Sequence, residues 1–289
     1  MRRFSRKATR ILRILAQTNY MEKPMIANYH THTYRCHHAT GTEKEYIERA
    51  IEGGIKYMGF SDHIPCISLD GSESAFRVSM DDRFNYSRKI LALKEEYRDR
   101  IDIKLGYEAE YCPLLFDRML EVCRETNAEY LILGQHFVGN EYKKGERVTS
   151  TESDSEERLR SYVDQVCEGM RTGYFSYVAH PDVIRFSGDK EILRTHMRRL
   201  CRVSIETGIP LELNFLGIRE GRHYPNADFW ELVGEMGCEV VYGCDAHDKK
   251  SAYDGESFKK AEEMRKKYNL KVLSVPRLID IRKLSTKNA

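Results

Sequence analysis

The sequence predicts an α/β protein, a distorted barrel of parallel strands with about seven strand–helix units and the helices outside. Three observations lead to this prediction. A strand, a loop and a helix recur along residues 26–289 without a break in composition. No Gly/Ser linker or internal repeat divides this region, so we expect a single domain. The first turn holds histidines, where a doubly wound dinucleotide-binding sheet would need glycines.

The expected strands are short apolar runs that end at a polar residue or a turn signal. In one of them Ile101, Ile103 and Leu105 alternate with other residues, as the side chains on one face of a strand do. We expect strands at residues 26–32, 55–60, 101–107, 129–134, 175–179, 210–213 and 239–242, and a last strand or an extended tail at 270–275.

The expected helices carry apolar residues at helical spacing between start and stop signals. The first begins with a capping box at Thr42 and Glu45 and ends at Gly53. Pro113 is expected in the first turn of another helix. We expect the later helices at residues 84–98, 113–124, 156–171, 190–207, 228–236 and 255–268, with polar loops at 71–82 and 139–155.

Composition argues against several classes of protein. The 289 residues carry a net charge of only +2, so we expect neither a nucleic-acid partner nor a membrane partner. Eight cysteines lie far apart without a Cys-x-x-Cys pair, which is typical of reduced thiols in a cytoplasmic protein. Residues 1–25 are basic, and we expect a solvated, disordered extension there; the alternatives are a membrane-binding or nucleic-acid-binding arm and a targeting peptide.

Four of the ten histidines fall within nine positions, at the end of the first expected strand. Because strand side chains alternate with period two, His30 and His32 project from the same face and can bind one ion. The following loop can bring His37 or His38 to a neighbouring position. This cluster predicts a metal site.

The other expected strands also end at residues that bind metals. In a barrel of parallel strands these ends converge on one face, where active sites of such folds are built. A single histidine is more often a packed core residue, and the recurrence at nearly every strand end raises the odds of ligation. The residues in question are His30, His32, His63, Glu108, His136, His180, Asn214, Asp245 and His247.

The number of candidate ligands exceeds what one ion can bind. With His38 there are nine imidazole or carboxylate candidates, which predicts two or three divalent ions sharing a carboxylate. Imidazole together with carboxylate suits zinc, iron or manganese better than magnesium. Such a cluster is typical of metal-assisted hydrolysis, so we expect a hydrolase.

The order and spacing of these residues resemble the polymerase and histidinol phosphatase (PHP) superfamily. The resemblance extends from Asn28 to about His247, and an Asn214–Arg219 segment followed by Tyr224 and Pro225 is similar to its histidinol-phosphatase branch. The motifs that carry it are His30-x-His32 with His38, Asp62-His63, Gly106-Tyr-Glu108, Gly134-Gln-His136, Ala179-His180-Pro-Asp and Asp245-Ala-His247.

The resemblance implies a distorted (β/α)7 barrel of the PHP type with a trinuclear metal site. His30, His32, Glu108 and Asp245 would bind the first ion; Glu108 would bridge to a second, completed by His136 and His180; His38, His63 and His247 would bind the third. Asp62 would orient a ligand imidazole. Glu108, Asp245 and His247 would be the catalytic residues, and Arg185, Arg219 and Asn214 would bind phosphate.

The resemblance also implies the reaction. We expect a phosphomonoesterase that takes a small phosphate ester, L-histidinol phosphate in histidine biosynthesis. Two alternatives stay open: a phosphodiesterase or nuclease of the same superfamily, and a metal-binding module without catalysis. Glu110, on the same strand face as Glu108, would bind a cationic group of the substrate or pair with an arginine. No residue stands out as the acid for the leaving group.

Overall fold

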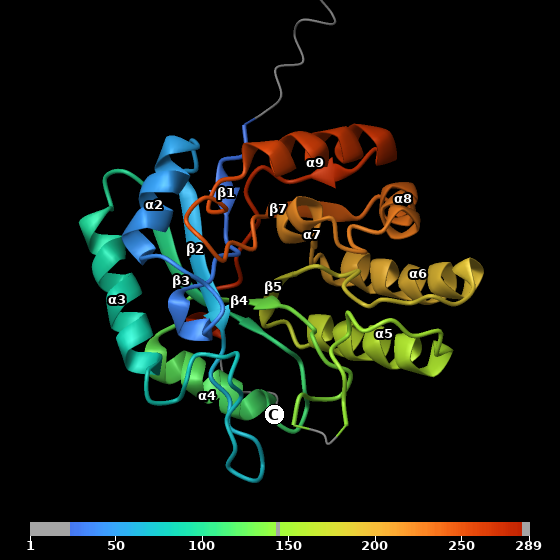
Figure 1. Cartoon of the computed structure of the whole chain (residues 1–289), viewed down its shortest axis with the longest axis horizontal. Coiled ribbons are helices and arrows are strands. Elements are labelled where there is room, and N and C mark those ends of the chain that lie inside the picture. The colour runs from blue at the N-terminus through green and yellow to red at the C-terminus, as the bar shows by residue number, and fades with distance from the viewer. Residues whose placement is uncertain (1–23, 143–144, 285–289) are drawn as a thin grey trace, which may run out of the picture.

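The computed structural model describes residues 24–142 and 145–284, so most of the basic extension expected at residues 1–25 lies outside the described residues. Eight parallel strands form one sheet in chain order, β1 to β8, curled with the helices around its outer side (Figure 1). The strands are β1 (Ala27–Asn28), β2 (Tyr57–His63), β3 (Asp102–Ala109), β4 (Tyr130–Leu133), β5 (Phe175–Val178), β6 (Leu211–Asn214), β7 (Glu239–Gly243) and β8 (Lys271–Val272).

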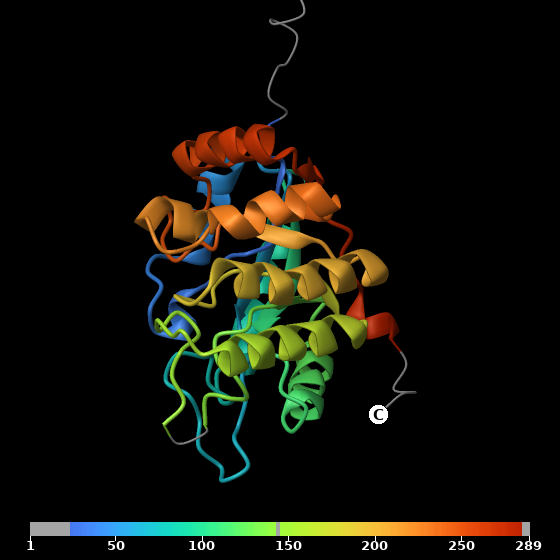
Figure 2. The same ribbon diagram turned by 90° about the vertical axis from the view of Figure 1, so that its right-hand side faces the viewer.

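The helices follow the strands along the chain and cover the outer face. Figure 2 shows α9, α8, α6 and α5 stacked one above another on one side of the molecule. The capping box of α2 is present, because Thr42 and Glu45 bond to each other's backbone amides. The helices are α2 (Glu43–Glu52), α3 (Arg83–Glu96), α4 (Phe116–Thr126), α5 (Glu156–Arg171), α6 (Lys190–Thr207), α7 (Phe215–Glu220), α8 (Ala227–Met236) and α9 (Gly255–Tyr268), with short turns η1 (Tyr34–Cys36) and η2 (Ile281–Lys283).

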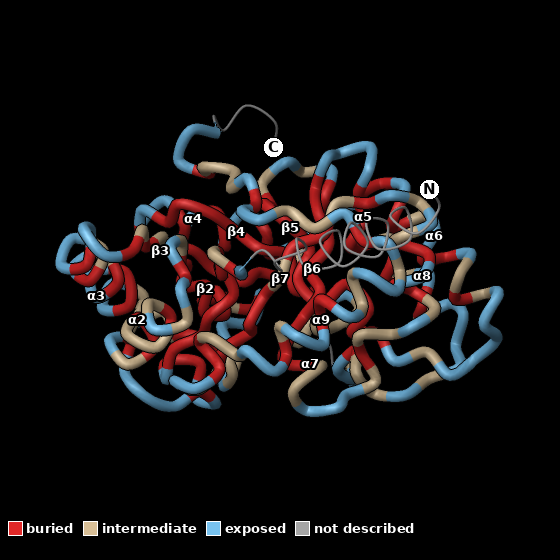
Figure 3. Tube along the Cα trace, turned by 90° about the horizontal axis from the view of Figure 1, so that it is seen from above, coloured by how far each residue is buried: buried red, intermediate tan, exposed pale blue. Residues whose placement is uncertain are grey.

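The sheet is buried on both faces, and its strands occupy the centre of the molecule (Figure 3). The outer face packs against the helices in one large apolar cluster. The inner face carries a smaller cluster that includes Tyr29, Tyr130 and Tyr177. A Cβ at Gly59 or Gly106 would overlap the Tyr130 ring, so these glycines make room for it. The inner aromatic cluster forms the floor beneath the carboxyl ends of the strands.

Among the described residues a single β-bridge joins the β1 side of the curled sheet to the β7 side. Just beyond β1 and β7, Thr31 forms an isolated bridge with Ala246. The His32 amide donates to the Ala246 carbonyl at 2.9 Å, and the Ala246 amide donates to the His30 carbonyl at 3.3 Å. The segment expected as a last strand or a tail forms the two-residue β8, which pairs with the start of β7. The predicted barrel is confirmed in this distorted form.

Three local predictions differ from the structure. The strand expected at residues 26–32 is regular only over the two residues of β1, so His30 and His32 lie beyond its end. Pro113 lies before α4, because the amides of Leu115 and Phe116 both donate to the Cys112 carbonyl at 2.9 Å and form a turn there. The helix α7 was not expected, since six residues are too few to show a helical period. Its amino end is capped by the Asn214 side chain. No helix in the described ranges is long and apolar enough to cross a bilayer.

Candidate metal centre

A cavity of about 810 Å³ opens at the carboxyl ends of the strands. Its walls come from loops that are far apart in the sequence, including the expected polar loops at residues 71–82 and 139–155. Eight of the nine predicted metal ligands line it, and His30 lies buried beneath them. The eight are His32, His38, His63, Glu108, His136, His180, Asp245 and His247.

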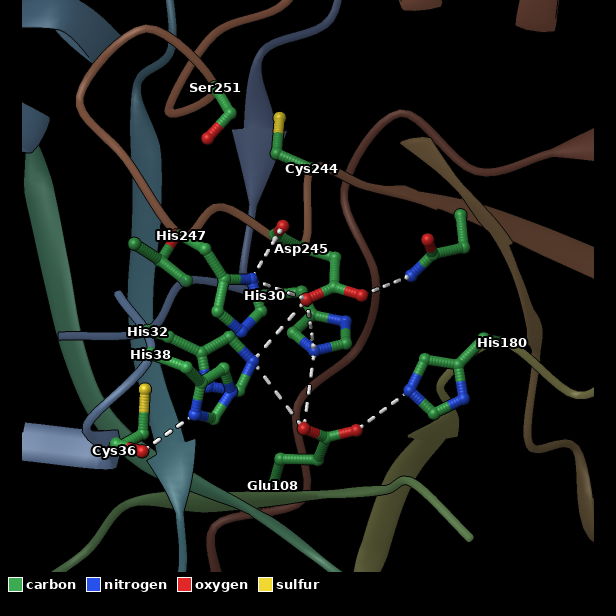
Figure 4. A network of polar contacts seen from close by, with 12 residues as sticks. His30, His32, Cys36, His38, Glu108, His180, Cys244, Asp245, His247 and Ser251 are labelled. Atoms are coloured by element: carbon green, nitrogen blue, oxygen red, sulfur yellow. Dashed lines mark hydrogen bonds and ion pairs between the residues drawn. The ribbon is translucent and has the colours of Figure 1, made fainter. Parts of the chain in front are cut away.

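Four of the nine predicted ligands, His30, His32, Glu108 and Asp245, converge at one point (Figure 4). The Nε2 atoms of His30 and His32 lie 3.5 and 3.4 Å from Glu108 Oε2, and 3.5 and 3.4 Å from Asp245 Oδ1. Four ligands around a zinc-like ion with bonds of 2.0–2.2 Å would be separated by about 3.3–3.6 Å. These four nitrogen–oxygen distances match that spacing, so the four side chains can surround one ion.

Unpaired polar atoms mark the same point. Nε2 of His30, Nε2 of His32 and Oε2 of Glu108 are buried, and no described residue forms a hydrogen bond with them. Buried polar atoms are rarely left unpaired, because desolvation without a partner costs about 1–3 kcal/mol each. A cation bound between them would satisfy all three, so the donor set fits a divalent metal ion.

The second oxygen of Glu108 faces two more imidazoles. His180 Nε2 lies 2.9 Å from Glu108 Oε1, and His136 Nε2 lies 3.6 Å from it. Gly134, at the end of β4, makes room for this carboxylate, since a Cβ there would overlap Oε1. The two oxygens of Glu108 thus face two different groups of histidines, as a bridging carboxylate requires.

A third group lies nearer the mouth of the cavity. The nearest ring nitrogens of His38, His63 and His247 all lie within 4.8 Å of one another. The His38 Nδ1–H donates to the Cys36 carbonyl at 2.6 Å, which leaves Nε2 with a free lone pair. His37 adopts a left-handed conformation with φ 66° and is exposed, so this turn directs His38 rather than His37 into the group.

Glu212, on β6, is the supporting residue that the sequence analysis missed. It is fully buried, and its Oε1 accepts the His30 Nδ1–H at 2.8 Å. Its Oε2 accepts the His180 amide at 3.0 Å and the Asn214 side-chain amide at 2.8 Å. This arrangement fixes the tautomer of His30 and directs its Nε2 lone pair toward the ion site. Gly243 makes room for the Glu212 carboxylate, since a Cβ there would overlap Oε1.

Two residues just beyond strand ends have strained backbone conformations. The backbones of His180 and Asp245 have φ values of 30° and 45°, which residues other than glycine rarely adopt.

The Asp62 carboxylate lies 3.4 Å from His32 Nδ1 and accepts hydrogen bonds from the amide and the hydroxyl of Thr33. Asp62 thus lies where the sequence analysis expected an orienting residue.

Burial and the neighbouring charges shift the pKa values of the cluster in both directions. Burial opposes ionisation of Glu108 and Asp245, yet the surrounding imidazoles hold the pKa of both carboxyls well below the ordinary range. Burial lowers the pKa of His63 well below its ordinary value, and burial together with the charge on His32 lowers that of His247 to about 3. Burial opposes protonation of His30, His32 and His180, but the neighbouring carboxylates raise the pKa of all three above its ordinary value. Because a metal binds the neutral imidazole, metal binding at these three residues displaces protons.

Comparison with protein families agrees with the sequence motifs. Residues 28–215 match the family profile of the PHP domain, which is more than half of the chain. The chain belongs to the PHP domain family. The matched region contains seven of the nine predicted ligands, including Glu108, and Asp245 and His247 lie beyond it.

Similar proteins share most of the PHP domain. A probable histidinol-phosphatase of Deinococcus radiodurans is 28% identical over 226 residues, which are 77% of this chain and 86% of that protein. The histidinol-phosphatase of Bacillus subtilis is 24% identical over 251 residues, 75% of this chain and 92% of that protein. The fold matches a histidinol phosphate phosphatase of Lactococcus lactis, crystallised with zinc, L-histidinol and phosphate, at a TM-score of 0.67 and 18% identity, covering 91% and 99% of the two chains.

The three residues predicted to bind phosphate do not line the cavity of this PHP domain. Asn214 is buried, and its amide donates to Glu212 at 2.8 Å and to Asp245 at 3.1 Å. Arg219 donates to the carbonyls of Cys244 and Asp245, at 3.2–3.4 Å, and pairs with Asp254 at 3.3 Å. Arg185 pairs with Glu152 at the surface. The contacts of Asn214 and Arg219 favour support of the Asp245 loop, and phosphate binding by the three stays a prediction.

Proposed function

We propose that this PHP domain is a metal-dependent phosphomonoesterase that hydrolyses L-histidinol phosphate to L-histidinol and inorganic phosphate. The observation that carries the proposal is the four-atom group of His30, His32, Glu108 and Asp245, whose spacing suits a metal ion. The similarity to histidinol-phosphatases over about three quarters of the chain supports the substrate.

The proposed ligands fall into three groups around Glu108. His30, His32 and Asp245 would hold one ion with Glu108, and His136 and His180 a second; His38, His63 and His247 would hold a third. Zinc, iron or manganese would suit these donors. Bound there, divalent ions lower the pKa of water and neutralise phosphate charge, which is the chemistry of phosphoester hydrolysis. Glu108, Asp245 and His247 are the residues that we propose as catalytic.

The chain itself supplies position and charge. Glu212 and Asp62 hold the two imidazoles of the first group, so the site needs little rearrangement when the substrate enters. The ligands at the floor of the cavity are buried, with His30 0% and Glu108 1% exposed. We further propose a cytoplasmic location, which rests on the eight free cysteines of the chain.

The test is release of inorganic phosphate from a panel of L-histidinol phosphate, other phosphomonoesters and a short oligonucleotide, with zinc, iron or manganese supplied. We expect L-histidinol phosphate to give the highest kcat/KM. Glu108→Gln should reduce turnover by at least about a thousandfold while circular dichroism stays unchanged, since one charge of the cluster is lost. An exposed control, Glu235→Gln, should retain activity. Preference for the oligonucleotide would overturn the assignment.

A further inference from the structure

Two charged side chains line the cavity in addition to its imidazoles and the two carboxylates of the cluster. Within the described residues these are Glu220, at the end of α7, and Arg222, one residue beyond Gly221. They form an ion pair in which Glu220 Oε2 accepts from Arg222 Nε at 2.8 Å and from NH2 at 2.7 Å. The cavity wall therefore presents a negative and a positive charge side by side.

The Glu220–Arg222 pair is held next to the metal centre. Arg222 NH1 donates to the Tyr224 hydroxyl at 3.1 Å. Tyr224 is buried, and its ring centroid lies 6.2 Å from that of His180, which belongs to the second group of proposed ligands. The buried tyrosine thus connects the pair to the site of the reaction, although both charged side chains remain close to half exposed.

Both members of the pair keep capacity for a ligand. Glu220 Oε2 accepts both N–H groups, and no described residue donates to Oε1. The guanidinium group carries five N–H donors, of which the three described contacts use three. The carboxylate can therefore accept from a cation, and the guanidinium can donate to an anion, without breaking the pair.

The other acidic candidate in this region is already occupied. Glu110, which the sequence analysis considered for a cationic group, lies buried between Arg77 and His136, 3.5 Å from Arg77 NH2 and 3.4 Å from His136 Nδ1. It pairs with an arginine instead, and it does not line the cavity. This leaves Glu220 as the carboxylate available to a substrate cation among the described residues outside the metal cluster.

We propose that the Glu220–Arg222 pair is a subsite for phosphomonoesters that carry an ammonium group a few bonds from the phosphate. Glu220 binds the ammonium group and Arg222 binds a phosphate oxygen, so that the two charges of the substrate lie head to tail against the two charges of the pair. The inference rests on the proposed function and adds a class of substrate, the phosphate esters of 2-amino alcohols, to which L-histidinol phosphate belongs.

The experiment compares three esters on the metal-loaded enzyme. They are L-histidinol phosphate, its desamino analogue 3-(imidazol-4-yl)propyl phosphate, and p-nitrophenyl phosphate. We expect the wild type to prefer the amine over the desamino ester about five- to tenfold in kcat/KM, the effect of one partly exposed charge-assisted contact. Glu220→Gln should remove this preference by raising KM for the amine only. Arg222→Gln should raise KM for all three esters.

A matched pair elsewhere provides the control. Arg171 and Glu206 form an exposed ion pair at 3.8 Å between α5 and α6, away from the cavity, and Glu206→Gln should leave all three KM values unchanged. Equal kcat/KM for the amine and desamino esters in the wild type would overturn the inference. Equal losses on both esters in Glu220→Gln would do the same, because they would indicate a change in loop shape. If the proposed function is wrong, the wild type will not release phosphate from L-histidinol phosphate, and the subsite falls with it.

Discussion

Replacing Glu212 with glutamine tests how the buried carboxylate controls the metal centre. Its oxygens receive three N–H donors: His30 Nδ1 at 2.8 Å, the His180 amide at 3.0 Å and the Asn214 side chain at 2.8 Å. Glutamine has almost the same shape but offers one oxygen and one NH2 group. Its NH2 group would therefore face either one donor of the protein, His30 Nδ1, or two, the His180 amide and the Asn214 side chain.

The two orientations have different costs. If the glutamine NH2 faces His30, the imidazole must accept at Nδ1, which moves its proton to Nε2 and blocks ligation in the first group. If the NH2 faces His180, the buried His180 backbone N–H and the Asn214 side-chain amide both lose their acceptor, at a cost of about 1–3 kcal/mol each. Loss of a supporting hydrogen bond typically weakens metal affinity 10–100-fold, and we expect Glu212→Gln to fall in about this range.

The assay is competition for zinc against a chromophoric chelator, with zinc content measured after dialysis. We expect Glu212→Gln to lose one equivalent more readily than the wild type while its circular dichroism is retained. Glu231→Gln, an exposed substitution on α8, is the control and should bind as the wild type does. Unchanged zinc affinity in Glu212→Gln would refute the argument that the carboxylate sets the His30 tautomer.

Three further predictions follow from the packing of the site. Gly134→Ala should fold but lose most activity, because the new methyl group displaces Glu108 Oε1; zinc content and kcat measure this. Arg77→Gln should lower kcat and thermal stability together, because buried Glu110 loses its cationic partner at 3.5 Å; melting curves and turnover measure both. Thr42→Ala should lower stability by about 1 kcal/mol without changing KM, because it removes the amino-terminal cap of α2.

For each of these three substitutions, one result would contradict the prediction. Gly255→Ala, where a methyl group meets ordinary contacts of 3.6 Å, should be nearly neutral; if it lost as much activity as Gly134→Ala, overlap would not be the cause. A wild-type melting temperature in Arg77→Gln would mean that Glu110 needs no cation. A changed KM in Thr42→Ala would mean that the cap acts on the cavity.

The positions of the proposed ligands were predictable because parallel strands bring their carboxyl ends together. His63, Glu108, His136 and His180 each stand at or just beyond the end of a strand, so alternation and strand order sufficed to place them near one another. The helices were predictable where a cap and an apolar period coincide, as in α5, whose predicted and observed bounds agree.

The supporting residues were harder to predict. Glu212 lies within β6 between two leucines, and an acidic residue on a strand usually indicates an exposed face. Its only signal is its position two residues before Asn214, on the same strand face. The resemblance implies that Arg219 binds phosphate, which stays a prediction, and spacing alone cannot tell which way a long side chain turns. In the structure it turns toward the Cys244 carbonyl.

The single bridge between Thr31 and Ala246 has a consequence for how the molecule holds together. The two segments that meet there are 215 positions apart, and each carries ligands on both sides of the contact. An ion bound by His30, His32 and Asp245 would cross-link these two segments, in addition to its role in catalysis. Removal of the ion by a chelator should then loosen the barrel first where the segments after β1 and β7 meet. We expect amide hydrogen exchange to rise near Thr31 before it rises in β3 or β4.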